Sequence, residues 1–168
     1  MPSPPRMPKV YFASDHAGFA LKSALIEQVR TSGYEVEDLG AFSLEPEDDY
    51  PDFIMPCAER VAQEGARALG IIIGGSGQGE AMCANRVKGA RAAVFYGPMR
   101  VTSALDIEGG RSEDGYDLVR LARRHNDANL LSIGARFVSG DEAVKAVRIF
   151  LDTSFSESPR HARRLAKF

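Results

Sequence analysis

The sequence predicts a three-layer α/β/α sandwich built on a five-stranded parallel sheet, which is a Rossmann-like fold. Short β-rich or apolar runs alternate with amphipathic segments along the chain. Residues 69–73 form a continuous apolar run, which is typical of a strand buried on both faces, and residues 90–96 are expected to be another buried strand. At 168 residues, the chain has the length of one domain with a substantial core.

The individual elements follow from hydrophobic spacing. Strands are expected where β-branched and apolar residues cluster, and helices where apolar residues recur about every 3.6 residues. In chain order, we expect a strand at 9–14, a helix at 18–32, a strand at 34–39, a helix at 51–68, a strand at 69–73, a helix at 80–87, a buried strand at 90–96, a long helical region ending near 124, a strand at 130–134, a helix at 141–151 and a basic amphipathic tail.

Two segments stand apart from this alternation. Residues 1–8 are rich in proline, and we expect them to form a flexible extension before a single domain of residues 9–168. Residues 106–117 are acidic and rich in glycine, and they interrupt what should be one helix. They are expected to be an insertion, either a solvated surface loop or a lid over the active site.

Composition argues against several classes of function. A net charge of −2 provides no electrostatic basis for general binding of nucleic acid or of a membrane surface. The two cysteines, Cys57 and Cys83, form neither a CxxC pair nor a cluster with histidines, so no metal site is expected. There is no apolar run of membrane-spanning length and no secretory signal, and a cytoplasmic location is expected.

Chemistry-bearing residues follow three of the expected strands. Asp15 and His16 come after the first strand, the glycine-rich loop 74–79 and Glu80 after the third, and Arg136 after the fifth. Ligands of open parallel sheets bind outside the carboxyl ends of the strands. We therefore expect these residues to converge at one edge of the sheet.

The glycine-rich loop is the most informative motif. Four of the six residues 74–79 are glycine, which lets the backbone approach a ligand closely and direct several N–H groups at it. A P-loop would end in Gly-Lys-Ser/Thr, which is absent here. A dinucleotide site would need GxGxxG and an acidic residue after the next strand, but the spacing is GxGxG and that strand ends in Phe95-Tyr96.

Glu80 supports a third interpretation of the loop. A carboxylate beside several amide donors can remove a proton next to a carbonyl while the amides stabilise the resulting enediolate. From the loop alone, an equal alternative is that Glu80 only stabilises the start of a helix. His125 could likewise be a C-terminal helix residue or an acid/base. Arg160 and Arg164, one helical turn apart, could be solvated or could grip a phosphate together.

At these residues the sequence resembles the family of ribose-5-phosphate isomerase type B and galactose-6-phosphate isomerase. The resemblance covers nearly the whole chain and depends on five motifs in the family's order. They are SDHAGF at 14–19, DYPDF at 49–53, IIIGGSGQGEAMCANRVKGARA at 71–92, RRHNDANLLSIGAR at 123–136 and PRHARR at 159–164.

The resemblance implies which residue is the base. One group of family members carries a cysteine just before the glycine-rich loop. The other group has a small residue there and a glutamate just after the loop. Gly74 and Glu80 place this chain in the glutamate group.

The resemblance also implies the remaining roles. Ring opening and proton handling would involve Asp15 and His125, and Ser76 would line the oxyanion hole with the amides of Gly75, Gly77 and Gly79. Asn126 and Tyr50 would contact substrate hydroxyls. The groups implied to hold the phosphate are His16, Arg136, Arg160 and Arg164.

The resemblance further implies that no cofactor is needed and that each site is built across a subunit interface. His125 and Asn126 would come from the partner chain, so a homodimer or homotetramer is expected. The expected activity is conversion of ribose 5-phosphate to ribulose 5-phosphate through a cis-enediolate. The alternatives are isomerisation of a hexose 6-phosphate, such as allose or galactose 6-phosphate, and a non-catalytic sugar-phosphate-binding protein.

Overall fold

The computed structural model describes residues 7–168. The expected flexible extension lies largely in residues 1–6, outside the described part of the chain. The strands are β1 (Lys9–Ser14), β2 (Val36–Asp38), β3 (Ala68–Gly74), β4 (Ala92–Phe95) and β5 (Leu130–Gly134). The α-helices are α1 (Phe19–Thr31), α2 (Pro51–Glu64), α3 (Gln78–Ala84), α4 (Asp117–Asn126), α5 (Gly140–Asp152) and α6 (Pro159–Leu165).

The five strands form one parallel sheet in the order β2-β1-β3-β5-β4, which confirms the predicted architecture. From β1 the chain first turns to β2 on one side and then crosses to β3 on the other. The topological switch point therefore lies between β1 and β3. Parallel sheets of this kind bind ligands at the carboxyl end of their switch point.

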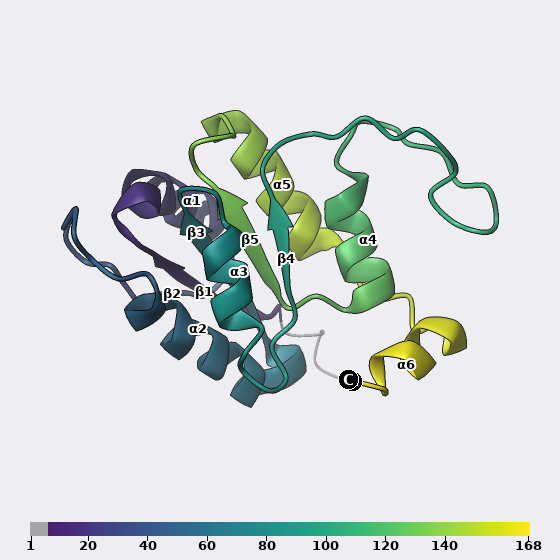
Figure 1. Cartoon of the computed structure of the whole chain (residues 1–168), viewed down its shortest axis with the longest axis horizontal. Coiled ribbons are helices and arrows are strands. Elements are labelled where there is room, and N and C mark those ends of the chain that lie inside the picture. The colour runs from purple at the N-terminus through teal and green to yellow at the C-terminus, as the bar shows by residue number, and fades with distance from the viewer. Residues whose placement is uncertain (1–6) are drawn as a thin grey trace.

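Helices cover both faces of the sheet and create two separate cores (Figure 1). Helices α1, α4 and α5 pack on one face, and α2 and α3 on the other. Strand β1 contributes alternately to the two cores, with Val10 and Phe12 on the first face and Tyr11 and Ala13 on the second. This alternation follows from the two-residue period of a strand, and it explains why buried strands are continuously apolar.

Several predicted elements differ from the structure. The helix predicted at 51–68 ends at Glu64, where Gly65 has a positive φ of 58°, and Ala68 already begins β3. The strand predicted at 90–96 is shorter, and residues 92–94 are only half-buried because β4 is at the edge of the sheet. The helix expected before residue 106 is absent. Instead, residues 97–116 form a long loop that extends beyond α4 (Figure 1), and the helix begins only at Asp117.

The long loop is anchored at its end through Asp114. Its carboxylate accepts two hydrogen bonds from Arg120, at 2.7 and 2.9 Å, and it lies 3.0 Å from the ammonium group of Lys145. These cations hold the pKa of Asp114 well below its usual range. The loop therefore returns to the domain at a defined point. Within residues 7–168, no helix is both long enough and apolar enough to span a bilayer.

Candidate active site

Glu80 lies in the first turn of α3, directly after the glycine-rich loop, and only 4% of it is exposed. Its carboxylate packs against the backbone of Gly74 at the end of β3. A methyl group at position 74 would overlap both carboxylate oxygens. Glycine at this position therefore provides the space in which the Glu80 carboxylate lies.

The surroundings of Glu80 suit a base. Burial raises the pKa of the Glu80 carboxyl, and the negative charge of Asp15 raises it further. Hydrogen bonding by the backbone amides of Glu80 and Gly77 acts in the opposite direction. A carboxyl group shifted towards neutral pH accepts a proton more readily than an ordinary surface glutamate.

The loop that precedes Glu80 is fixed to β5. Gly77 has a left-handed backbone (φ 74°), and its carbonyl accepts a hydrogen bond of 2.6 Å from the Ser132 hydroxyl. The carbonyls of Gly74 and Gly75 accept hydrogen bonds from Ala135 and Arg136. The loop is thus preorganised before any ligand arrives, which is what electrostatic stabilisation of an oxyanion requires.

Ser76 is exposed in this loop, and its hydroxyl oxygen accepts a hydrogen bond of 3.3 Å from the Gln78 amide. Helix α3 itself is only seven residues long. Because the dipole of so short a helix is small, we expect the loop amides to be the main donors to a bound anion.

Asp15 and His16 lie at the end of β1, on the other side of the switch point. One oxygen of Asp15 accepts hydrogen bonds from the amides of Ala17 and Gly18, at 2.9 and 3.2 Å, and so starts the next turn. The His16 ring nitrogen Nδ1 lies 2.7 Å from Asp48 Oδ1 and 4.0 Å from Asp15 Oδ2. Within residues 7–168, Asp15, His16 and Asp48 are the one group of acidic and histidine side chains spaced closely enough to hold a metal ion. The short His16–Asp48 hydrogen bond accounts for their closeness.

Arg136 and Tyr50 complete this group. The guanidinium of Arg136 lies beside Gly75, where an added Cβ would be 3.2 Å from it. The ring and hydroxyl of Tyr50 lie beside Gly79, where an added Cβ would be 2.9 Å from the hydroxyl. The structure therefore confirms the predicted convergence of an acid, a histidine, the glycine-rich loop, Glu80 and an arginine at one edge of the sheet.

The remaining predicted site residues form a second group. His125 and Asn126 end α4, and Arg160 and Arg164 lie on α6. His125, Arg160 and Arg164 line a cavity of about 190 Å³ together with residues of the long loop, including Asp106 and Glu108. Asn126 lines a neighbouring hollow beside β4 instead.

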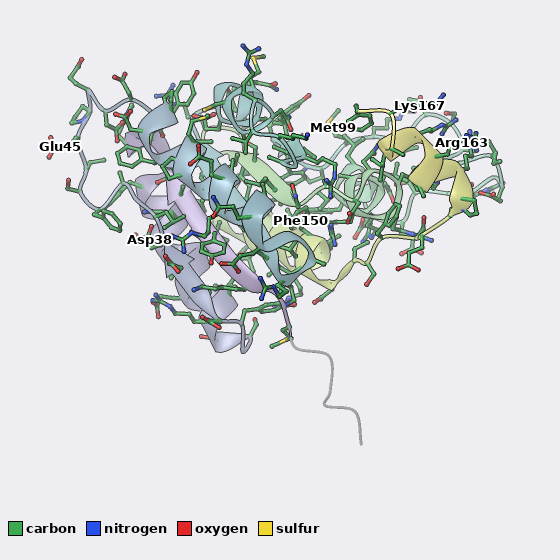
Figure 2. The ribbon with its side chains drawn as sticks, turned by 90° about the horizontal axis from the view of Figure 1, so that it is seen from below. Asp38, Glu45, Met99, Phe150, Arg163 and Lys167 are labelled. Carbon is green, nitrogen blue, oxygen red and sulfur yellow. The ribbon has the colours of Figure 1, made fainter. Side chains whose placement is uncertain are left out.

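The two groups do not meet within one chain. His125 precedes β5, whereas Arg136 follows it, so the length of the strand lies between them. Figure 2 shows the positions of the two segments that adjoin these groups. Glu45, in the segment that leads to Tyr50, and Arg163, on α6, lie on opposite sides of the molecule.

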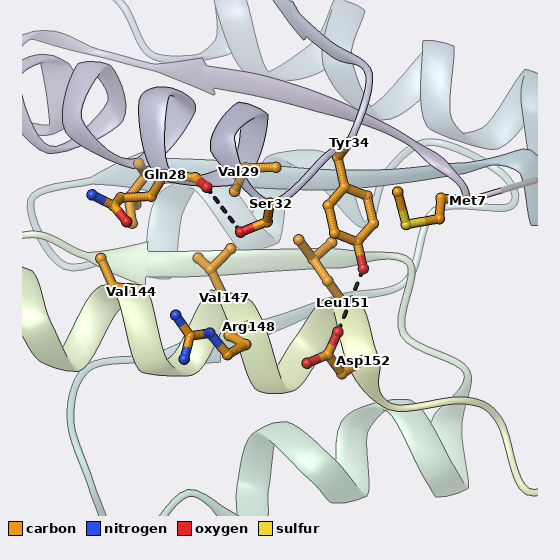
Figure 3. A pocket seen from close by; sticks show the side chains of 11 residues that line it. Met7, Gln28, Val29, Ser32, Tyr34, Val144, Val147, Arg148, Leu151 and Asp152 are labelled. Carbon is orange, nitrogen blue, oxygen red and sulfur yellow. Dashed lines mark hydrogen bonds between the residues drawn. The ribbon is translucent and has the colours of Figure 1, made fainter.

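A further cavity, of about 220 Å³, contains none of the predicted site residues (Figure 3). It lies between α1 and α5 and is lined by apolar side chains such as Leu25, Val29 and Val147, with Arg148 and Asp152 at its rim. It has no convergent set of acid, base and amide donors, so it is not a candidate for the same chemistry.

Sequence reasoning missed two residues of the site region. Asp48 hydrogen-bonds His16, and the ring of His161 stacks on that of His125 with centroids 4.1 Å apart. His161 lies inside the PRHARR motif, in which the resemblance implies roles only for arginines. No pattern in the sequence links Asp48 to His16, which is 32 residues away.

The fold and the site together define a class of enzyme. A buried carboxylate beside a rigid loop of amide donors can move a proton between two carbons of a carbonyl compound. Comparison with known proteins agrees with this. The model of the Ribose/Galactose Isomerase family matches residues 10–108 and 113–168.

Individual relatives cover almost the whole chain. The ribose-5-phosphate isomerase B of Mycolicibacterium paratuberculosis is 40% identical over 157 residues, which are 94% of this chain and 87% of the relative. The solved structure of ribose-5-phosphate isomerase B from Mycoplasma genitalium with bound ribulose-5-phosphate is 36% identical. It has a TM-score of 0.81, with 95% of this chain and 92% of the other covered.

The Thermotoga maritima ribose 5-phosphate isomerase structure is also similar, with a TM-score of 0.79 and 34% identity over 96% of this chain and 97% of the other. The chain therefore belongs to the ribose/galactose isomerase family. It is an aldose–ketose isomerase with the α/β/α fold of that family.

Proposed function

We propose that the chain interconverts ribose 5-phosphate and ribulose 5-phosphate through a cis-enediolate, with Glu80 as the base. The observation that carries the proposal is the buried Glu80 carboxylate, which lies against Gly74 beside the amide loop. The choice of sugar is supported by the relatives, which are named for ribose 5-phosphate, and by the ribulose-5-phosphate bound to one of them.

In the proposed reaction, Glu80 removes the proton from C2 of the open-chain aldose. The electron pair of that C–H bond forms the C1–C2 double bond of the enediolate, and the loop amides stabilise its charged oxygen. A proton moves from the O2 hydroxyl to O1, and Glu80 returns its proton to C1 as the C2 carbonyl forms, which gives the ketose. The base ends in its starting state, and the amides supply the electrostatic stabilisation, so the step needs neither a metal nor an organic cofactor.

The complete site is proposed to use two copies of the chain. One copy supplies Asp15, His16, Arg136 and Glu80, and a second supplies the group of His125, Asn126, Arg160 and Arg164. The basis is that His125, Arg160 and Arg164 line one cavity with Asn126 adjacent to His125 in the chain, and that this group is separated from the first within one chain. Arg160 and Arg164 would bind the phosphate at one end of the sugar, and Glu80 would face the reacting carbons at the other end.

Within this arrangement His125 and Asp15 are proposed to assist ring opening. Burial lowers the pKa of His125, and the neighbouring charges of His161 and Arg124 lower it further. Asp106 and Glu108 oppose that shift. A histidine that is mostly neutral at physiological pH can accept the hydroxyl proton of the cyclic sugar.

A substrate screen in D₂O tests the proposal. Ribose 5-phosphate, allose 6-phosphate and galactose 6-phosphate are each incubated with the protein, and deuterium incorporation at C2 of the aldose and C1 of the ketose is followed by NMR. We expect ribose 5-phosphate to react with the highest kcat/KM. A faster hexose phosphate would support the alternative substrate class, and no exchange with any sugar would indicate a non-catalytic binder.

A further inference from the structure

Asp48 is the closest partner of His16, and it contacts that residue twice. Its oxygen Oδ1 lies 2.7 Å from Nδ1 of the His16 ring and 3.1 Å from the His16 backbone amide. The Asp48 side chain is 8% exposed, whereas the His16 side chain is 31% exposed. A buried carboxylate therefore fixes one ring nitrogen, and the rest of the ring remains accessible.

The segment that carries Asp48 is fastened to the end of β1. The Gly40 carbonyl accepts a hydrogen bond of 2.7 Å from the Ser14 amide, and the Ala41 amide donates one of 2.7 Å to the Ser14 carbonyl. The buried ammonium group of Lys22 donates to the Ala41 carbonyl and to Asp38, both at 2.6 Å. These contacts fix residues 38–41 beside β1, and the two hydrogen bonds to His16 place Asp48 at the same edge.

The hydrogen bond decides which ring nitrogen carries a proton. A carboxylate accepts but does not donate, so the proton of the neutral imidazole stays on Nδ1. The other nitrogen, Nε2, is then an acceptor and cannot donate to a phosphate oxygen. Only the doubly protonated, cationic ring presents an N–H at Nε2.

The charges around His16 favour that cationic form. The hydrogen bond to Asp48 is the largest influence and raises the His16 pKa, and the charge of Asp15 raises it as well. Desolvation and the positive charge of Arg136 act in the opposite direction. Among residues 7–168, Asp48 Oδ2 is one of two buried side-chain atoms without a hydrogen-bond partner. The two hydrogen bonds of the other oxygen, Oδ1, both come from His16.

We infer that Asp48 is a positioning residue that keeps His16 protonated and oriented as a donor to the substrate phosphate. This inference rests on the proposed function for the identity of the ligand. The protonation state of His16 is a property of the free protein, so that part of the inference does not depend on the proposed function. Phosphate affinity should then be high below the raised pKa of His16 and fall as the pH rises through it.

The direct test is an NMR titration of the three histidines in the unliganded full-length protein and in Asp48→Asn. The amide oxygen of asparagine can still accept from the His16 backbone, but the negative charge is lost. We expect the His16 pKa to fall by about one unit in the variant, while the titrations of His125 and His161 stay unchanged. Asp49→Asn removes the same charge from the exposed neighbouring residue, and it should leave His16 unchanged.

A second readout separates this role from a merely structural one. With ribose 5-phosphate, Asp48→Asn should raise KM several-fold at pH 7.5 with little change in kcat, and the difference from wild type should shrink at pH 6. With inorganic phosphate as the probe, the dissociation constant should follow the same pattern. An unshifted His16 titration, or a KM increase equal at all pH values, would overturn the inference. Loss of isomerase activity with every sugar, but a normal His16 shift, would count against the proposed function alone.

Discussion

At the scale of single residues, the account depends on the space that Gly74 leaves for the Glu80 carboxylate. Gly74→Ala should displace the carboxylate and lower kcat by about 100-fold, because displacements near 1 Å cost that much in a positioned site. Gly140→Ala, at a position where an added Cβ meets nothing within 4 Å, is the matched control and should keep normal activity. Steady-state kinetics and far-UV circular dichroism of both variants test this, and a fully active Gly74→Ala would contradict it.

The same geometry offers a physical reason for the division by catalytic base that the resemblance implies. A cysteine side chain at position 74 would occupy the volume that the Glu80 carboxylate fills here. The resemblance describes a cysteine before the loop in one group and a glutamate after it in the other. Both bases would compete for the same place beside the amide donors, so one chain has room for only one of them.

The buried Glu80 carboxylate should also reduce the stability of the fold. Its pKa is raised on folding, so the folded state becomes less stable as the pH rises from the ordinary carboxyl value of 4.5 through the raised value. Glu80→Gln never ionises and should melt a few degrees higher than wild type at pH 8, with no difference at pH 4. Thermal melts at both pH values test this, and a variant that melts lower at pH 8 would contradict it.

At the scale of secondary-structure elements, the long loop brings negative charge to the side of α6 that is proposed to bind the phosphate. Asp106 and Glu108 line the same cavity as Arg160 and Arg164. Asp106→Asn with Glu108→Gln should therefore lower KM for a sugar phosphate several-fold at low ionic strength, and the gain should shrink in high salt. Glu113→Gln, an exposed residue of the loop outside this cavity, is the control. An unchanged or higher KM in the double variant would show that the loop does not act on the phosphate.

The elements differ in how well the sequence predicts them. Strand β5 was predicted with its observed bounds, because a buried parallel strand is apolar at almost every position. The helix expected before residue 106 was wrong, since Pro98 and the glycines of the loop leave no helical pattern strong enough to persist. The exposure of β4 could not be predicted either, because edge position depends on the strand order and not on the composition of the strand.

Site residues show the same division. Asp15, Glu80 and Arg136 could be placed together because each follows a strand, and parallel strands end at one edge. The contact between Asp48 and His16 joins residues 32 apart through an irregular segment. The ring stacking of His125 and His161 depends on where α6 lies. Such contacts arise from tertiary packing, which no local pattern encodes.

At the scale of the whole molecule, the two separated groups predict that activity needs two chains. Glu80→Gln and His125→Gln should each inactivate the protein when present in every chain. When the two variants are dissociated, mixed and reassociated as dimers, one site of each mixed dimer combines both intact residues. Activity should recover to about a quarter of the wild-type value, as random pairing in a symmetric dimer requires. Full activity of a strictly monomeric protein, or no recovery in verified mixed dimers, would contradict a shared site.

The most direct test of the central claim follows proton exchange at the substrate. Wild type and Glu80→Gln are compared in D₂O with ribose 5-phosphate, and NMR measures both isomerisation and deuterium incorporation. We predict that the variant still binds the substrate but loses both activities by about 100- to 10,000-fold, as removal of a general base does. If Glu80→Gln retains exchange and isomerisation within tenfold of wild type, Glu80 is not the base.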